Sequence, residues 1–194
     1  MCGRFTLRNI KEVKSQFNLN FDLPPNFNIA PSNETLVLSD ELTLMPWGYS
    51  PTWAKSKVNI INARIETLHQ KPSFRSARRC LVLADGWYEW GTSHSGKFPY
   101  FFHREGELIL LAAICTQNRE KPGFAIVTQD ANEDIQVIHH RMPLVVEKNQ
   151  IDQWIHSKGT FSSEKSEEYH FHKVSKFVNS PQNNNEACVA PVQS

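Results

Sequence analysis

The chain has no long hydrophobic run. Nowhere do its 194 residues approach the ~20 consecutive apolar residues that a membrane-spanning helix needs. Charged residues between Arg4 and Lys14 interrupt the amino-terminal region before the apolar core of a signal peptide could form. We therefore expect a cytoplasmic protein.

Cysteine pairs at metal-binding spacing are also absent. Cys2, Cys80, Cys115 and Cys188 form no CxxC pair, and the eight histidines occur without a nearby cysteine or an HExxH pattern. We therefore expect no metal and no cofactor. In a reducing cytosol Cys80 and Cys115, which each lie in an apolar run, should be small buried hydrophobes.

Net charge is low as well. At +1 the chain is no polycation, so a contact with nucleic acid must come from a local surface. Such a surface is indicated between residues 53 and 79, where basic residues accompany a single acid, Glu66. A solvated surface would give the same pattern. The basic residues are Lys55, Lys57, Arg64, Lys71, Arg75, Arg78 and Arg79.

What is present indicates an α+β domain dominated by antiparallel strands. The chain is 40% hydrophobic and 21% charged, and its length suits one domain with a sizeable core. We place the domain at residues 2–181 and a carboxy-terminal tail at 182–194, which we expect to be polar and loose from Asn183 through Asn185. We expect helices at 11–17 and 148–155, and strands at 35–38, 42–45, 80–83, 100–103, 108–114, 124–128 and 144–146.

The sequence opens with Met1-Cys2. If Met1 is removed, Cys2 carries an α-amine and a thiol on adjacent carbons. The amine can condense with an aldehyde, and the thiol can then close a five-membered thiazolidine. The unperturbed pKa values are ~7.8 for the amine and ~8.5 for the thiol, so both groups react near neutral pH.

Three internal segments place polar side chains among apolar or aromatic neighbours. Asn62 and Arg64 follow a strand-like isoleucine pair, and Glu89 lies among aromatic rings. Burial there would raise the pKa of the glutamate and suit it to acid–base chemistry. His139 and Arg141 would share one face of an extended segment. Each feature also has a plainer explanation: an amide in a turn, an ion pair with a lysine, a histidine in the core.

Together with the amino terminus, these segments resemble the SRAP (SOS-response-associated peptidase) family, whose members capture abasic sites in single-stranded DNA. The similar segments follow the family order from residue 2 to about 179. One departure is Ser180-Pro181, which follows the last of them. The segments are Met1–Phe5, Asn28–Pro31, Trp47-Gly48, Asn62–Glu66, Asp85–Trp90, His139–Pro143 and Val174–Asn179.

The resemblance implies a compact domain with a mainly antiparallel, barrel-like sheet surrounded by short helices. It also implies that the protein removes its own Met1 and that Cys2 then traps the sugar aldehyde as a thiazolidine. Glu89 would shuttle the proton that opens the sugar and discharges water. His139 would handle a second proton near the sugar oxygen, and Asn62 would hold the Cys2 amine or a sugar hydroxyl.

The resemblance further implies how DNA is held. Arg4, Arg64 and Arg141 would contact phosphates beside the baseless sugar, and Trp90 would stack on a flanking base. The expected partner is single-stranded DNA with abasic sites, bound by a monomer at the nucleoid. An abasic-site lyase activity is a further implication.

Two other functions stay open. Class II glutamine amidotransferases also begin Met-Cys-Gly and use the terminal thiol on an amide carbonyl. Here Arg4-Phe5 follows the glycine, and the Asn-Gly-Asp type of substrate motif is missing. A non-enzymatic single-strand DNA-binding module would use the basic segment 53–79, but it would give no role to Cys2, Glu89 or His139.

Overall fold

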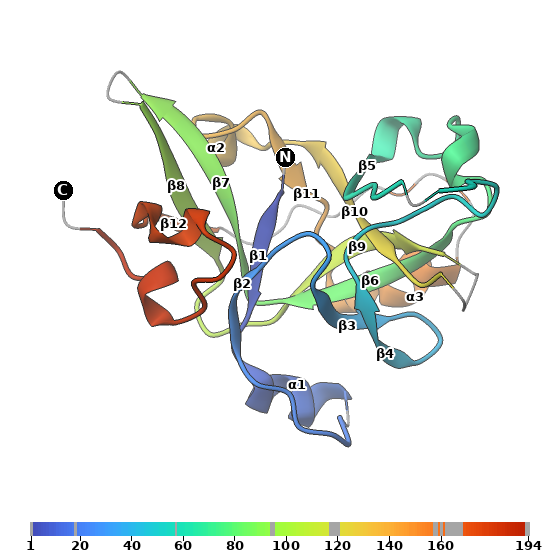
Figure 1. Cartoon of the computed structure of the whole chain (residues 1–194), viewed down its shortest axis with the longest axis horizontal. Helices are drawn as coiled ribbons and strands as arrows, with labels where there is room; N and C mark the ends of the chain where they lie inside the picture. Colours follow the sequence, from blue (N-terminus) through green and yellow to red (C-terminus); the bar gives the residue numbers. More distant parts are fainter. Residues whose placement is uncertain are drawn as a thin grey trace.

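The computed structural model has two β-sheets joined through one hydrophobic core (Figure 1). It describes residues 2–192 except 18, 57, 94–95, 117–120, 157–158, 160 and 162–168. A five-stranded sheet has the order β12-β8-β7-β1-β2. A seven-stranded sheet has the order β11-β10-β9-β6-β3-β4, with β5 added beside β10. The expected α+β class, with mainly antiparallel sheets and few helices, is confirmed.

The five-stranded sheet consists of β1 (Arg4–Leu7), β2 (Asn26–Ile29), β7 (Gly86–Ser93), β8 (Gly96–His103) and β12 (His170–Lys173). The seven-stranded sheet consists of β3 (Glu34–Leu38), β4 (Leu42–Pro46), β5 (Asn62–Arg64), β6 (Arg78–Ala84), β9 (Ile109–Cys115), β10 (Phe124–Asp130) and β11 (Arg141–Pro143). The helices are α1 (Ile10–Phe17), α2 (Glu133–Gln136) and α3 (Ile151–His156). Short 3-10 turns are η1 (Ile65–Thr67), η2 (Pro72–Phe74), η3 (Lys148–Gln150), η4 (Lys176–Asn179) and η5 (Glu186–Cys188).

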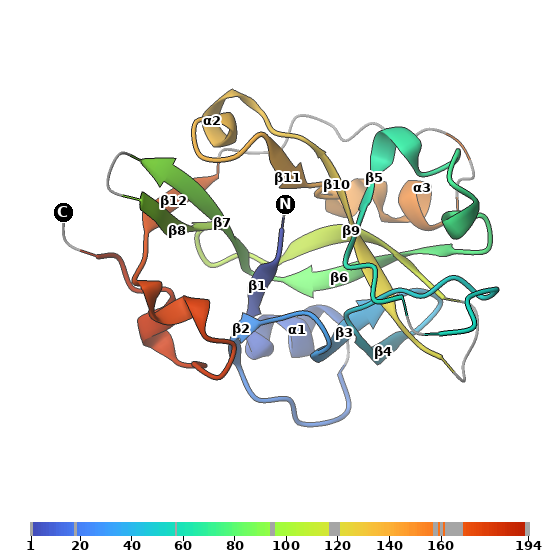
Figure 2. The same cartoon turned by 45° about the horizontal axis from the view of Figure 1, so that its top comes forward.

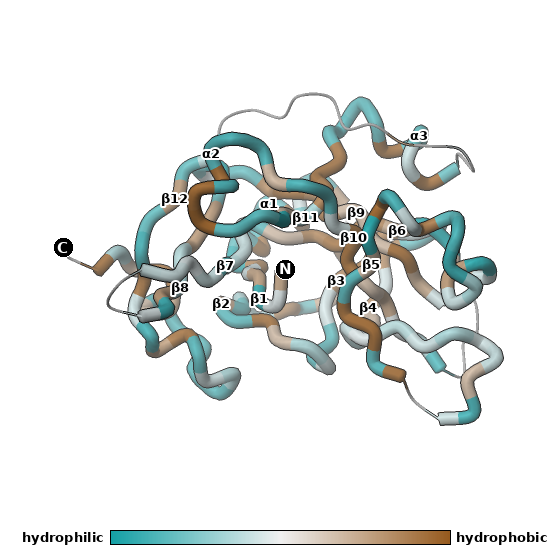
Figure 3. Tube along the Cα trace, turned by 90° about the horizontal axis from the view of Figure 1, so that it is seen from above, coloured by the Kyte–Doolittle hydropathy of each residue, from teal (hydrophilic) through white to brown (hydrophobic). Residues whose placement is uncertain are grey.

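The core is centred on β6, β9 and β10. Every residue of β9 is buried, as are the apolar positions of β6 and the first five residues of β10. Figure 3 shows the same strands as largely hydrophobic segments inside the molecule. Cys80 and Cys115 lie in these strands and are buried free thiols, as the sequence predicts.

Most of the expected elements are confirmed, with local differences. The predicted helix 11–17 is α1, and the predicted strands 35–38 and 42–45 form the antiparallel pair β3–β4. The predicted strand 144–146 is wrong, because Val145 forms only an isolated bridge with Leu111. The predicted helix 148–155 begins as the 3-10 turn η3 and becomes α-helical only at Ile151.

The expectation that the tail is loose from Asn183 through Asn185 is wrong, because the side chains of all three asparagines there form hydrogen bonds. Asn185 caps η5 with its side chain, and Cys188 is fully buried in a second apolar cluster with Tyr88 and Phe101. The backbone N–H of Val192 donates to the carbonyl oxygen of Lys173 over 3.0 Å. The tail therefore packs against the five-stranded sheet, beside β12.

Figures 1 and 2 show the start of β1 between β7 of one sheet and the β5–β10 edge of the other. The amino-terminal residues thus lie where the two sheets approach each other. Within the described residues, the helices are too short or too polar to cross a bilayer.

Candidate functional site

Strand pairing brings the amino terminus to Glu89. β1 runs antiparallel to β7, with Arg4 opposite Tyr88, so Cys2 and Glu89 lie at neighbouring positions at the same end of the pair. From the other sheet, β5 runs parallel to β10 and begins with Asn62. The Asn62 side-chain amide donates to the carbonyl oxygen of Cys2 over 2.9 Å. Three segments far apart in the sequence meet at Cys2.

Asp85 fixes the far end of β1. Its carboxylate accepts from the Thr6 hydroxyl over 2.5 Å and from the backbone N–H groups of Arg8 (2.5 Å) and Asn9 (2.8 Å). Hydrogen bonds to a carboxylate are among the stronger ones in proteins. Asp85 therefore sets the position of β1 against β7, and with it the position of Cys2.

The Cys2 thiol is inside the core. The side chain is fully buried, and Sγ lies 3.7 Å from the carbonyl oxygen of Arg4. Burial, together with the negative charge of Glu89, raises the pKa of the Cys2 thiol far above its usual range. The unperturbed pKa assumed from the sequence is therefore wrong for this arrangement. The thiol is protonated at neutral pH and needs a base to become a nucleophile.

Glu89 has the acid–base properties that its aromatic surroundings predict. Its side chain is 2% exposed, and burial raises its pKa to about 7. The positive charges of the amino terminus and of Lys97 act in the opposite direction. A carboxyl group with this pKa can donate or accept a proton near neutral pH.

His139 lies beside Glu89. Its Nδ1 is 3.9 Å from Glu89 Oε2 and 3.0 Å from both the backbone nitrogen and the backbone oxygen of Arg141. The Arg141 backbone can therefore donate to Nδ1 or accept from it, so either protonation state of that atom is satisfied. Burial lowers the pKa of His139, which favours the neutral ring at pH 7.

The side-chain oxygen of Asn62 is available as a hydrogen-bond acceptor. While its amide nitrogen is bonded to Cys2, its Oδ1 is buried and has no partner among the described residues. A buried acceptor without a partner is costly, and such atoms are uncommon in folded proteins. Asn62 Oδ1 could therefore hold an N–H or O–H group that enters the site.

Arg4 and Trp90 are joined to the carboxy-terminal turn η4. Arg4 donates to the side chain of Asn28 (2.7 Å) and to the carbonyl oxygens of Val178 (2.8 Å) and Asn179 (3.2 Å). Trp90 Nε1 donates to Asn179 Oδ1 over 2.9 Å. Both expected DNA-contact residues are partly exposed, and both also anchor η4.

Arg141 differs from the expectation that it contacts a phosphate. Its side chain is only 6% exposed, and its guanidinium is paired with Glu66 (2.7 Å) and Asp130 (2.5 Å). It also donates to the carbonyl oxygen of Thr128 over 2.7 Å. These bonds hold η1, β10 and β11 together, so Arg141 positions His139. By contrast, Arg64 is exposed.

Sequence reasoning assigned no role to Asn28, Asp85 or Asn179. The Asn28 amide is buried and donates to the carbonyl oxygens of Val178, Ser180 and Asn183. All three residues lie in or beside segments that resemble the family, which was the available signal. Their function is to position β1 and η4, and such a function depends on long-range contacts.

A metal centre has no support within the described part of the chain. No group of three or more His, Cys, Asp or Glu side chains there is arranged to hold an ion. The titratable side chains that the structure brings together at the site are those of Cys2, Glu89 and His139.

The family model for the SOS response associated peptidase (SRAP) matches residues 1–181. The chain is 32% identical to the abasic site processing protein YoqW of Bacillus subtilis, over 95% of this chain and 96% of the relative. It is 31% identical to the abasic site processing protein YedK of Escherichia coli, over 99% of this chain and 100% of the relative. A crystal structure of a Bacteroides thetaiotaomicron protein has the same fold, with a TM-score of 0.82, 22% identity and coverage of 99% of this chain and 100% of the other. The chain belongs to the SRAP family.

Proposed function

We propose that this protein captures abasic sites in single-stranded DNA covalently, through a thiazolidine formed by Cys2. The observation that carries the proposal is the meeting of Asn62, Glu89 and His139 around Cys2, from four separate segments of the chain. The names of the relatives, abasic site processing proteins, support the choice of substrate. The proposed acting species is a monomer. A substrate in DNA would place the protein at the nucleoid.

The proposed reaction starts at the α-amine of Cys2 after removal of Met1, which lies outside the described residues. The amine attacks C1′ of the ring-opened deoxyribose and forms a carbinolamine. Glu89 gives its proton to the carbinolamine hydroxyl, which leaves as water, and an iminium ion remains. The thiol adds to the iminium carbon and returns its proton to Glu89, which closes the thiazolidine with loss of one water molecule.

The residues around Cys2 have separate roles in this reaction. Glu89, with a pKa of about 7, acts first as acid and then as base, which overcomes the raised pKa of the buried thiol. Asn62 orients the amine through its bond to the Cys2 carbonyl. His139 exchanges the proton of the sugar oxygen when the ring opens, and it does so beside the same carboxylate.

We assign the DNA contacts to side chains that are exposed or partly exposed to solvent. Arg64 is the exposed guanidinium nearest in sequence to Asn62 and is proposed to contact a phosphate. Arg4 uses two bonds to hold η4 and a third to contact Asn28, and its remaining donors are proposed to reach a second phosphate. The partly exposed ring of Trp90 is proposed to stack on a base. Arg141 is assigned to positioning His139.

The test is incubation of the purified protein with single-stranded DNA that carries one abasic site, followed by denaturing electrophoresis. We expect a shifted band that survives denaturation and is absent with Cys2→Ala. Cys2→Ser is the matched variant, because it keeps the amine and an oxygen but cannot close the thiazolidine. Glutamine hydrolysis without a band would support the amidotransferase alternative. Reversible binding alone would support the binding module.

Removal of Met1 is tested separately by intact mass. The proposal requires the natively expressed chain to lack Met1, and it requires Glu89→Gln to retain more of it, because Glu89 is the group that assists autocatalytic removal. A wild-type chain that keeps Met1 and still forms the stable band would overturn the role of the amine. Strand scission at the abasic site in the same gel would reveal a lyase activity.

A further inference from the structure

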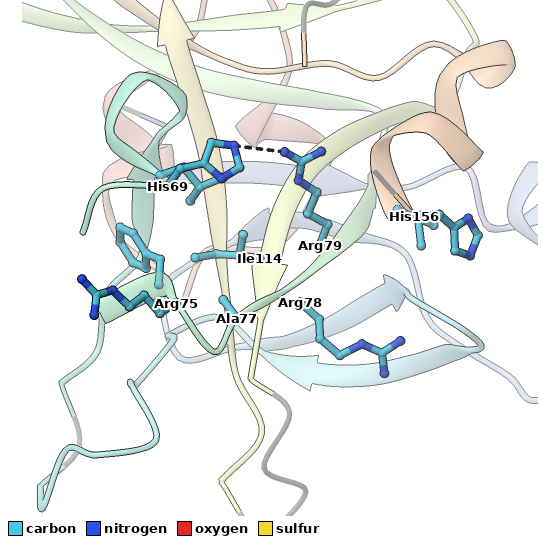
Figure 4. A pocket seen from close by; sticks show the side chains of 10 residues that line it. His69, Arg75, Ala77, Arg78, Arg79, Ile114 and His156 are labelled. Carbon is cyan, nitrogen blue, oxygen red and sulfur yellow. Dashed lines mark hydrogen bonds between the residues drawn. The ribbon is translucent and has the colours of Figure 1, made fainter. Parts of the chain in front are cut away.

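A second basic feature lies away from Cys2. A pocket of about 580 Å³ opens between the η1–η2 segment, the start of β6 and the end of α3. Among its ten lining residues are three arginines and two histidines, and none is acidic. They are His69, Arg75, Arg78, Arg79 and His156. The floor is apolar and includes Ala77 and Ile114 (Figure 4).

Arg79 is the most deeply buried of the three arginines in the pocket, and neighbouring side chains hold its guanidinium in position. The Arg79 guanidinium lies over the Trp154 ring, 4.5 Å from its centroid, and its Nη2 is 3.3 Å from His69 Nε2. Burial lowers the pKa of Arg79, and its guanidinium donates to the backbone carbonyl oxygens of Trp154 and Gly159. Its charge is thus held half-buried without a carboxylate partner in the described part of the chain. An anion entering the pocket would find this charge already positioned.

Arg75 and Arg78 lie at the exposed edge of the pocket. Figure 4 shows His69 and Arg79 facing each other, while the guanidinium groups of Arg75 and Arg78 point in opposite directions. Arg78 is paired with Asp40 over 2.5 Å, whereas Arg75 is exposed and has no ion pair within the described residues. The charges do not converge on one point, so the pocket suits an extended chain of anionic groups better than one small anion.

One continuous segment of the chain connects the proposed capture site with the pocket. β5 begins with Asn62 and ends with the exposed Arg64, and η1 leads directly from there to His69. In Figure 1, β5 and α3 lie on the same side of the start of β1. A strand held at Cys2 and Arg64 could therefore continue toward the pocket along this edge.

We propose that this pocket binds the phosphate backbone of single-stranded DNA beyond the abasic nucleotide, with Arg75 and Arg79 as the phosphate-binding side chains. The inference rests on the proposed function, because the strand is the one whose abasic sugar is captured at Cys2. The apolar floor accommodates a base or a deoxyribose face between successive phosphates.

The test compares undamaged single strands of about 5 and about 20 nucleotides in fluorescence anisotropy, with the short strand chosen to span only the capture site. Arg75→Ala should raise the Kd of the long strand about fivefold at 0.1 M salt and reduce its salt slope by about 0.7, as expected for one lost phosphate contact. Arg75→Glu should have a larger effect. The short strand should bind both variants as it binds wild type.

The matched control is Lys11→Glu, which makes the same kind of charge change at an exposed position of α1, outside the pocket. An unchanged Kd and salt slope for the long strand in Arg75→Glu would overturn the inference. An equal loss for both strands, or an equal loss in Lys11→Glu, would also overturn it. Covalent capture of a short abasic strand is measured in parallel. Its failure in wild type would overturn the proposed function, whereas its survival in Arg75→Glu separates the two outcomes.

Discussion

The side-chain amide of Asn62 donates to the main-chain carbonyl oxygen of Cys2 over 2.9 Å, and this bond links the two sheets at the proposed nucleophile. Asn62 begins β5 in the seven-stranded sheet, whereas Cys2 precedes β1 in the five-stranded sheet. The bond therefore fixes the amino terminus relative to the opposite wall. Asn62 Oδ1, buried without a partner among the described residues, is left to bind the substrate.

Replacing Asn62 by alanine should slow covalent capture about tenfold or more, which corresponds to about 1.4 kcal/mol of orientation lost in the transition state. Stability should fall by only about 1 kcal/mol, because one hydrogen bond is lost. Band formation over time and thermal unfolding measure the two effects. Asn20→Ala, at an exposed position, is the control. Capture by Asn62→Ala at the wild-type rate would remove Asn62 from the mechanism.

Glu89 should give the capture rate a maximum near neutral pH. The rate rises as the Cys2 amine loses its proton, and it falls as the Glu89 acid ionises around pH 7. Glu89→Gln should slow capture about 10²-fold and remove the fall on the alkaline side. Rates measured from pH 5 to about pH 9 test this. A fall that persists unchanged in Glu89→Gln would assign that ionisation to another group.

The same carboxyl group should make stability depend on pH. The pKa of Glu89 is raised from 4.5 to about 7 in the folded protein. The contribution of this carboxyl group to folding stability is therefore fully present below pH 4.5 and is lost as pH rises through 7. Wild type should therefore lose up to about 3 kcal/mol across this window relative to Glu89→Gln, which cannot ionise. Urea unfolding of both proteins at several pH values measures the difference. Glu105→Gln, at an exposed carboxyl, should show no such trend.

The elements that contain long apolar runs are the ones that the sequence predicts most accurately. The apolar stretches of β6, β9 and β10 are buried on both faces, and their near-continuous apolar runs predict central strands. β5 was missed, because it contains three residues with polar ends and is held by its pairing with β10. The polar sequence from Asn183 through Asn185 predicts a loose tail, which the structure does not show. There, Asn183 and Asn185 bond to nearby backbone, which composition does not reveal.

The sequence predicts which residues form the candidate site, but it predicts only some of their roles. The raised pKa of Glu89 follows from its aromatic neighbours in the sequence. The burial of Arg141 does not, because its partners Glu66 and Asp130 lie 75 and 11 residues away and charge pairing depends on the fold. The raised pKa of the Cys2 thiol likewise arises from packing between the sheets.

Arg141→Met should lower stability and leave the salt dependence of DNA binding unchanged. The substitution keeps most of the volume but removes the bonds to Glu66, Asp130 and the Thr128 carbonyl. We expect a loss of about 1–3 kcal/mol, limited because the two carboxylates are 44% and 84% exposed and remain hydrated. Urea unfolding measures this loss.

Arg64→Met is the matched comparison for Arg141→Met. Its exposed guanidinium should contribute to binding, so the salt slope for single-stranded DNA should fall by about 0.7 with little change in stability. A reduced slope in Arg141→Met, with Arg64→Met unaffected, would reverse the two assignments.

Ending the chain at residue 181 should destabilise the protein and slow capture. The truncation removes the Asn183 carbonyl that accepts from the buried Asn28 amide over 2.8 Å, and it removes Cys188 from the apolar cluster around Tyr88. We expect a loss of about 2 kcal/mol or more from the cavity and the unsatisfied amide. Capture should slow because η4 holds Arg4 and Trp90 through Asn179. Removal of residues 193–194 alone is the control, and equal urea midpoints for both truncations would show that residues 182–192 contribute nothing to the domain.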